Sequence, residues 1–263
     1  VLFGVFMGKA APAGREVLAN FWQGVFDTMM HITLFIMKFA PIGVFGLVAK
    51  TAMVTGLQSF APLAVFFLTV VFALGFHVFV TMAFLLKTLG GINPIAHYRA
   101  MFPAMLTAFS TASSSATLPV TMNCLRKNVG VSNKTSSFVI PLGATVNMDG
   151  TALYECVAAM FIAQAYGLDL TIGQQMLVVI VALLTSVGVA GIPSASLVAI
   201  AIVLSAIGLP LEGIGLLLVT DRVLDMLRTA VNVFSDSCCA AIMAKYEGEK
   251  NLYPSSSENS NTV

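Results

Sequence analysis

The longest uninterrupted apolar run, from Phe60 to Leu86, most limits what this chain can fold into. His77 is the only ionisable residue in it, and the run exceeds the about 20 apolar residues that a helix needs to cross a bilayer. Across the sequence 58% of residues are hydrophobic and 10% are charged, whereas soluble domains carry about 25% charged residues. We therefore predict an all-α integral membrane protein with transmembrane helices.

A second apolar run, residues 137–165, is interrupted by the polar segment Asn147-Met148-Asp149-Gly150-Thr151. Gly150 is expected to free the backbone there, and the polar side chains offer oxygen atoms at a depth where water is scarce. Polar groups in hydrocarbon need partners, and an ionisable residue at that depth indicates a functional site by default. The alternative is a structural kink whose polar groups are satisfied by a neighbouring helix.

Two further segments consist of paired apolar arms, each too short to span a bilayer. The first, residues 94–128, has a polar tip at Thr111–Ser115, and the second, residues 171–209, is interrupted at residues 188–196. We predict a re-entrant helical hairpin for each, which is allowed only where its tip lines a cavity or is buried in protein. Each hairpin precedes a helix, and such a repeat is typical of an inverted-repeat transporter. The other helices are expected at residues 60–86, 137–166 and 213–244.

Charge separates the two hairpins, because the ends of the first carry basic residues and the ends of the second carry acidic residues without Lys or Arg. The positive-inside rule places the base of the first hairpin and the C-terminal tail in the cytoplasm, and the second base outside. We predict a multi-pass protein of the plasma (cell inner) membrane. The net charge of +1 argues against a nucleic-acid partner. The basic residues at the ends of the first hairpin are Lys87, Arg99, Arg126, Lys127 and Lys134, and the acidic residues at the ends of the second are Asp169 and Glu212.

The two ends of the chain are less regular. Residues 26–54 are apolar enough to span, with a break at Pro41-Ile42-Gly43. Because the sequence opens at Val1 inside an apparent helix, we expect that N-terminal helices are lacking. Residues 247–263 are rich in Ser and Asn and are predicted to be disordered. The four cysteines have no metal-ligand spacing and are expected to pack as small residues.

The last helix carries its polar side chains on one face, within about 60° of Asp225 at about 100° per residue. Each charge at the bilayer centre costs about 2.5 to 3.5 kcal/mol, so this face must meet the hairpin tips and the Asn147–Thr151 segment. The alternative is a structural network pairing Asp225 with Arg228 and Asp221 with Arg222, which would leave both broken hairpins unexplained. The residues on this face are Asp221, Asp225, Arg228, Thr229, Asn232 and Asp236.

These polar groups divide by chemistry into two kinds of site. The planar fork of Arg228 suits a carboxylate and Asp225, one turn away, can bind an ammonium group, so the pair describes an acidic zwitterion. Hydroxyl groups at Ser113–Ser115, with the N–H groups that follow, also suit a carboxylate. Hard oxygen donors for an alkali cation come from Asn147, Asp149, Asn232 and Asp236, with carbonyls freed around Gly143 and Gly150.

Four motifs, in order over some half of the chain, resemble the glutamate/aspartate transporter family, that is, the excitatory amino acid transporters and the prokaryotic dicarboxylate/amino acid:cation symporters. They are Ser113–Pro119, Gly143–Tyr154, Ala190–Pro193 and Asp225–Val233. The resemblance implies a homotrimer whose subunits each pair a scaffold with a moving transport domain. On this basis residues 1–58 are the C-terminal part of the scaffold and trimerisation region, 59–246 the transport domain and 247–263 the tail.

The resemblance also implies individual roles. Arg228 and Thr151 would hold the side-chain carboxylate of the substrate, Asp225 its amino group, and Ser114 and Asn232 its α-carboxylate. Further substrate contacts would be Ser115, Gly191, Ile192, Pro193 and Thr229. One sodium would use Asn147, Asn232, Asp236 and the Gly143 carbonyl, a second the carbonyls of Thr145, Ser186, Val187 and Val189 with Met148 nearby, and a third Asp149 and Asn147 with an earlier helix. No organic cofactor is implied.

Three positions refine the resemblance. Glu155 stands where proton-coupled animal members carry a glutamate, so proton coupling, perhaps with potassium return, is a further expectation. Archaeal members have an extra arginine at the position of Ala112 and animal members at that of Met226. Arg222 is a candidate substitute, although snorkelling at the helix end is the alternative. Arg228 and Asp225 together favour glutamate or aspartate, because relatives for neutral amino acids lack the arginine and those for plain dicarboxylates lack the aspartate.

The sequence therefore predicts a sodium-coupled symporter of acidic amino acids that works by alternating access, and not an enzyme. A proton-coupled carrier of glutamate or dicarboxylates is the alternative within the class. An intramembrane aspartyl protease with an Asp149–Asp225 dyad is disfavoured, because Arg228 would keep Asp225 ionised where a dyad shares a proton. A structural or channel role is a third alternative, and saturable sodium-dependent uptake would separate a carrier from a pore.

Overall fold

The computed structural model describes residues 6–9, 11–39, 60–189, 191–249 and 252–253, with positions 42, 43, 45, 46, 49 and 53 between them. Within these residues the secondary structure is helical and contains no strand, which confirms the all-α prediction. The chain divides into two compact units, Val1–Lys50 and Thr51–Val263, and each is described by itself.

The first unit contains the helix α2, Pro12–Met37. Proline suits the first helical turn because its missing N–H would have no partner there. The helix begins well before the apolar residues 26–54, because the polar residues after Pro12 belong to the same helix. Of the predicted break, Pro41 lies outside the described residues, whereas Ile42 and Gly43 are helical. Most of residues 47–59 also lie outside them, and so does the boundary predicted after residue 58.

From Phe60 onward the second unit is described continuously to Val189, and it opens there with one long helical stretch made of α4 (Phe60–Phe76), the π-helical segment η2 (His77–Met82) and α5 (Ala83–Leu89). In the described part of the chain, Ala61–Leu89 is the one helix long and apolar enough to cross a membrane. It continues past the predicted end at Leu86 because Lys87 lies in the last turn, where a long cationic side chain is favourable.

Two helix pairs fold back on themselves near the predicted tips. The first comprises α6 (Pro94–Thr111), α7 (Ser114–Cys124) and the π-helical η3 (Leu125–Val129), and the second α10 (Ile172–Ser186) and α11 (Ser196–Ile207). At the first tip Ala112 takes a left-handed conformation (φ 51°), and the Ser113 side chain accepts a hydrogen bond from Ala116 N to cap α7. Α capping box at Thr171 and Gln174 starts α10.

The interrupted run forms α8 (Asn133–Val146) and α9 (Asp149–Ala165). The break falls at Asn147 and Met148, so the prediction that Gly150 frees the backbone was wrong. Gly150 lies in the first turn of α9, and a Cβ there would come within 2.9 Å of the Arg228 backbone oxygen. Its role is to let α9 approach the last helix closely.

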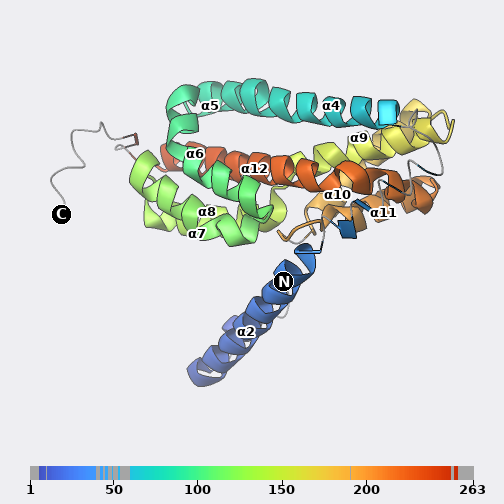
Figure 1. Cartoon of the computed structure of the whole chain (residues 1–263). Helices are drawn as coiled ribbons and strands as arrows, with labels where there is room; N and C mark the ends of the chain where they lie inside the picture. Colours follow the sequence, from blue (N-terminus) through green and yellow to red (C-terminus); the bar gives the residue numbers. More distant parts are fainter. Residues whose placement is uncertain are drawn as a thin grey trace. The chain divides into compact units, whose positions relative to one another are not determined.

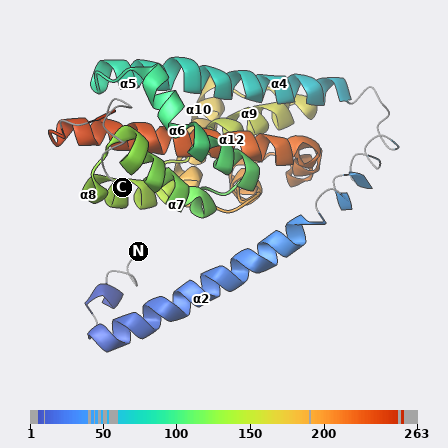
Figure 2. The same cartoon turned by 60° about the vertical axis from the view of Figure 1, so that its left-hand side comes forward.

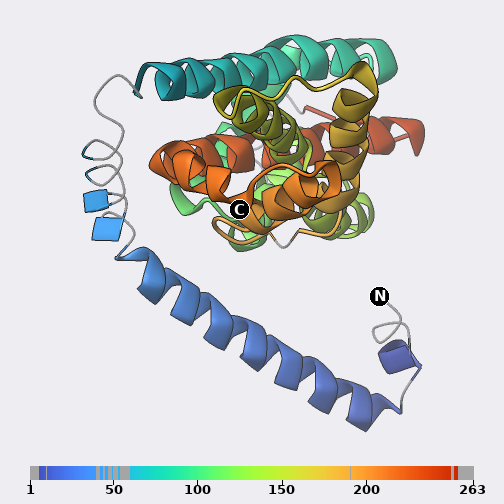
Figure 3. The same cartoon turned by 90° about the vertical axis from the view of Figure 1, so that its right-hand side faces the viewer.

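The last helix, α12 (Ile214–Tyr246), follows the short 3-10 segment η4 (Leu211–Gly213) and forms the centre of this unit. Figures 1 and 2 show α4, η2 and α5 running along α12, with α6 to α8 packed beside it. In Figure 3 the unit is turned so that α10 and α11, which pack on α9, lie toward the viewer. Through this arrangement both helix-pair tips and the α8–α9 break reach the polar face of α12.

Candidate functional site

A cavity lies where three separate segments meet on α12. The first tip, the α8–α9 break and the second tip each contribute side chains, as the sequence predicted from their polar character. Seven of the predicted substrate contacts line it, namely Ser114, Thr151, Gly191, Ile192, Asp225, Thr229 and Asn232. Ala112, Met148, Val189, Ala195 and Ser196 complete the lining, whereas Ser115, Pro193 and Arg228 lie outside it. Ser196, whose buried hydroxyl has no partner among the described residues, was not predicted.

The two tips contact each other through one carbonyl group. The backbone oxygen of Gly191 accepts from Ser113 Oγ at 2.7 Å and from Ser115 N at 3.2 Å. A Cβ at Gly191 would lie 2.8 Å from Ser115 Oγ and 3.2 Å from the Ala144 oxygen. Glycine is therefore required here for the second tip to close on the first, and Ser115 acts at this contact instead of inside the cavity.

Arg228 is 1% exposed and only partly satisfied. Its Nη2 donates to Asp221 Oδ1 at 3.1 Å and to Asp225 Oδ1 at 2.9 Å, and its guanidinium stacks on Tyr154 at 3.8 Å from the ring centroid. Nε and Nη1 have no partner within the described part of the chain. Buried donors without acceptors are costly, so this half of the fork is available for a planar acceptor.

The alternative ion-pair network is thus only half correct. Asp225 does pair with Arg228, but Asp221 pairs with Arg228 and accepts from Tyr154 Oη at 3.2 Å, and not with Arg222. The second oxygen of Asp225 accepts from the backbone N of Ser194 at 2.8 Å. The carboxylate therefore joins α12 to the second tip, beside the cavity that both of them line.

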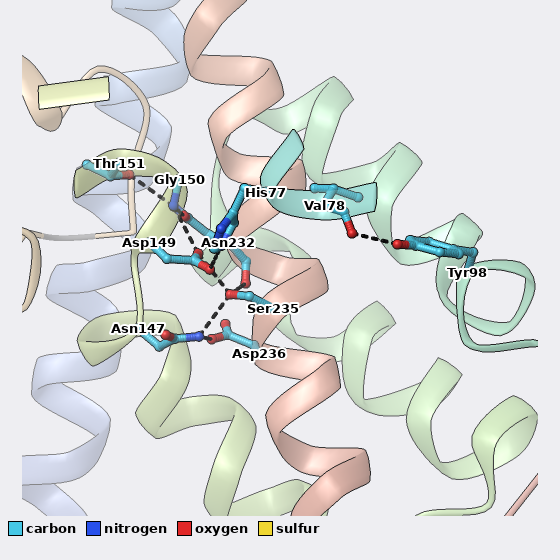
Figure 4. A network of polar contacts seen from close by, with 10 residues as sticks. All are labelled: His77, Val78, Tyr98, Asn147, Asp149, Gly150, Thr151, Asn232, Ser235 and Asp236. Atoms are coloured by element: carbon cyan, nitrogen blue, oxygen red, sulfur yellow. Dashed lines mark hydrogen bonds and ion pairs between the residues drawn. The ribbon is translucent and has the colours of Figure 1, made fainter. Parts of the chain in front are cut away.

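A chain of hydrogen bonds connects the α8–α9 break to α12 (Figure 4). Asn147 Nδ2 donates to Asp236 Oδ1 and to Ser235 Oγ, each at 2.9 Å, and Ser235 Oγ donates to Asp149 Oδ1 at 2.8 Å. A Cβ at Gly143 would lie 2.5 Å from Asp236 Oδ1. The structure thus brings together four predicted sodium ligands, although the Gly143 carbonyl also accepts from Asn147 N at 2.8 Å.

A second part of the same network lies nearer the cavity. Gly150 N donates to Asn232 Oδ1 at 2.8 Å and Asn232 Nδ2 donates to Thr151 Oγ1 at 3.0 Å. We call the side chains of Asn147, Asp149, Asn232, Ser235 and Asp236 the oxygen cluster, and Asn232 therefore belongs both to this cluster and to the cavity wall. No group of three or more His, Cys, Asp or Glu gathers among the described residues, and the donors here are amide, hydroxyl and carboxylate oxygens, which suit a hard cation.

The profile of the sodium:dicarboxylate symporter family matches residues 1–246. The chain belongs to this family. It is 41% identical over 251 residues to the proton/sodium-glutamate symport protein of Geobacillus stearothermophilus, which is 95% of this chain and 59% of that protein. It is 42% identical over 246 residues to excitatory amino acid transporter 3 of Mus musculus, 93% of this chain and 47% of the relative. The chain thus spans about half the length of the curated relatives it matches, and the resemblance read from the four motifs is confirmed.

In this symporter-family chain His77 contacts the oxygen cluster directly. Its Nε2 lies 2.7 Å from Asp149 Oδ2, and it comes from the π-helical segment η2 (Figure 4). The sequence identified His77 only as the one ionisable residue of its apolar run and did not reveal its partner, because the two residues are 72 positions apart. Ser235 was also missed, since it falls about 80° from Asp225 on the helical wheel, just outside the predicted face.

The remaining predicted residues lie around the cavity. Met148 and Val189 line it from the α8–α9 break and the second tip, while Thr145 lies in the last turn of α8 and Ser186 and Val187 at the end of α10. Glu155 is fully buried, and its Oε2 accepts from Thr185 Oγ1 at 2.8 Å. Its Oε1 has no partner among the residues described.

Proposed function

We propose that this chain forms the substrate-binding part of a secondary active symporter that moves glutamate or aspartate together with sodium by alternating access. The observation that carries the proposal is Arg228, a buried arginine with two unpaired donors beside the cavity-lining Asp225. The printed names of its relatives, a proton/sodium-glutamate symport protein and excitatory amino acid transporters, support the same substrate class.

In this proposal each charged group of the substrate is bound by its own set of residues. Arg228, with Thr151, binds the side-chain carboxylate of the substrate. The planar guanidinium can form two parallel hydrogen bonds to a carboxylate, and this geometry selects an acidic substrate over one with a neutral side chain. Asp225 binds the ammonium group in exchange for the Ser194 N–H. Ser114 and Asn232, both in the cavity wall, bind the α-carboxylate, and Thr229 and the Gly191–Pro193 segment close the site.

Sodium binds, in this proposal, to Asn147, Asn232 and Asp236 of the oxygen cluster and to the Gly143 carbonyl. A second sodium uses the Thr145, Ser186, Val187 and Val189 carbonyls beside Met148, and Asp149 contributes to a third. Asn232 belongs to both the cluster and the cavity, so cation and substrate share a ligand. Each therefore raises the affinity of the other by the same factor, which is the basis of coupling.

The membrane arrangement is part of the proposal. The two helix pairs are re-entrant hairpins of an inverted repeat within residues 59–246, and residues 1–58 belong to a scaffold that forms a homotrimer in the plasma membrane. The base of the first hairpin and the C-terminal tail are cytoplasmic, as their basic residues favour. The intramembrane-protease alternative is not supported, because Asp149 pairs with His77 and Ser235 while Asp225 pairs with Arg228.

The test is equilibrium binding of aspartate and glutamate to the purified full-length protein across a sodium series at two pH values. We expect the dissociation constants to fall steeply as sodium rises. Binding that is indifferent to both sodium and pH would overturn coupling.

A proton-coupled carrier is the second candidate, and Glu155 favours it. A fully buried carboxyl oxygen without a donor is better accommodated when the group carries a proton. Binding or transport that depends on pH but not on sodium, and that loses its pH dependence in Glu155→Gln, would make this candidate the better one. If substrate binding in Glu155→Gln loses its pH dependence but still depends on sodium, the proton is coupled in addition to sodium.

Replacing His77 with phenylalanine is expected to raise the sodium concentration needed for half-maximal substrate binding by about tenfold, because partners that orient a metal ligand are worth about 10- to 100-fold in affinity. His77→Gln keeps an N–H donor near Asp149 and is expected to retain most of the affinity. Sodium titrations of the three proteins at saturating substrate measure this. Asp149 Oδ1 also accepts from Ser235 Oγ at 2.8 Å and from Gly150 N at 2.9 Å. Equal sodium affinity in all three proteins would show that these two bonds position Asp149 without His77.

A further inference from the structure

The chain reverses direction directly after α12. Gly248 has a φ of +79°, and its N–H donates to the Lys245 oxygen at 3.1 Å while Glu249 N donates to the Ala244 oxygen at 3.0 Å. This pair of bonds around a left-handed glycine is a Schellman motif, which ends a helix and turns the chain back. Glu249, Leu252 and Tyr253 lie beyond this turn and contact the same unit.

Glu249 docks on the start of α8. Its carboxylate accepts from Ser132 N at 2.8 Å, Ser132 Oγ at 2.7 Å and Thr135 Oγ1 at 2.6 Å. Partial burial acts to raise the pKa of Glu249, but these hydrogen bonds and the charge of Lys134 outweigh it, so the pKa lies below its ordinary 4.5. The group is ionised at neutral pH, where a negative charge at a helix N-terminus is favourable.

Tyr253 docks on the base of the first helix pair. Its backbone N donates to the Val129 oxygen at 2.6 Å, and its hydroxyl lies 2.6 Å from Nδ1 of His97, a residue with no exposed surface. The two rings also meet edge to face at 6.0 Å between centroids. Leu252 and Tyr253 pack against the hydrophobic core.

The hydrogen-bond directions at His97 follow from its other neighbour. Ser237 Oγ donates to the Phe234 oxygen at 2.6 Å, so toward His97 Nε2, 2.9 Å away, it can only accept. A neutral His97 with its proton on Nε2 then accepts the Tyr253 hydroxyl proton at Nδ1. One continuous relay therefore runs from Tyr253 through His97 to α12, and every member is satisfied.

We propose that Glu249, Leu252 and Tyr253, which follow the turn at Gly248, form a latch that fixes the base of the first helix pair to α8 and α12. The sequence assigned these residues to a disordered tail, whereas their contacts join three elements at the end of the unit away from the cavity. The latch determines how firmly α6 and η3 are held at their base, and its release increases local opening there. This inference does not depend on the substrate or on the coupling ion.

Hydrogen–deuterium exchange of the full-length protein without substrate tests the latch. We expect Glu249→Gln and Tyr253→Phe to raise exchange about tenfold in peptides covering residues 94–101 and 125–136, the size expected for losing one charged or buried hydrogen bond. The matched controls are Glu247→Gln and Tyr246→Phe, which change exposed neighbours of the same types. Unchanged exchange in both latch variants, or equal increases in the controls, would overturn the proposal.

Discussion

Replacing Arg228 with lysine is expected to weaken binding of aspartate and glutamate by at least about 100-fold. Lysine keeps the positive charge that Asp221 and Asp225 require, so the buried carboxylates remain compensated and the protein stays folded. What is lost is the planar fork, and two charge-assisted hydrogen bonds are worth about 1.5 to 3 kcal/mol each. Calorimetric titration with aspartate, glutamate and a neutral amino acid such as serine measures the effect.

Two comparisons make this experiment specific. Arg222 lies on the same helix and has no ion pair among the described residues. The Arg222→Lys variant is therefore expected to bind acidic substrates with an affinity within a fewfold of that of the parent protein. If Arg222→Lys instead shows the larger loss, Arg222 supplies the substrate's counter-charge. Serine binding is expected to change little in Arg228→Lys, because the α-carboxylate and ammonium contacts remain.

Replacing Gly143 with alanine is expected to remove most of the sodium dependence of substrate binding. The added Cβ would lie 2.5 Å from Asp236 Oδ1 and 2.8 Å from its Cγ, so the carboxylate must move away from Asn147. Displacing a ligand or its orienting partner costs about 10- to 100-fold in metal affinity, and overpacking adds about 1 to 3 kcal/mol of destabilisation. Sodium titrations and thermal unfolding of the purified variant measure the two effects separately.

Gly75→Ala is the matched control for this substitution. Gly75 lies inside α4 and an added Cβ meets nothing within 4 Å, so the variant is expected to be neutral or stabilised by up to about 1 kcal/mol through helix propensity. Sodium affinity should stay at the parent value. A Gly143→Ala protein with full sodium affinity would place the cation away from Asp236.

The sequence predicted the elements that surround the site because the cues were local. Polar tips between short apolar arms located both helix pairs, and the helical period placed Asp225, Arg228 and Asn232 on one face of α12. The pairing of Asp149 with His77 could not be read in the same way, since only the folded chain brings η2 beside the α8–α9 break.

Local cues also misled in two places. Gly150 was taken as a chain break because glycine is flexible, yet the structure uses its small size to let α9 reach the Arg228 backbone. Residues 247–253 were grouped with a disordered tail because of their polar composition. Composition does not reveal that Glu249 accepts a hydrogen bond from Ser132 at the N-terminus of α8, because the two residues are 117 positions apart in the chain.

The hydrogen bond from the Ser194 N–H to Asp225 competes with any ligand that would bind the same carboxylate. If the substrate ammonium binds Asp225 as proposed, the hydrogen bond from the Ser194 N–H in the second tip must break first. The measured affinity is then the intrinsic affinity multiplied by the fraction of molecules in which the tip is released. A substitution in residues 187–195 that loosens this tip, without touching the substrate, would therefore tighten apparent binding up to the limit at which the tip is always free.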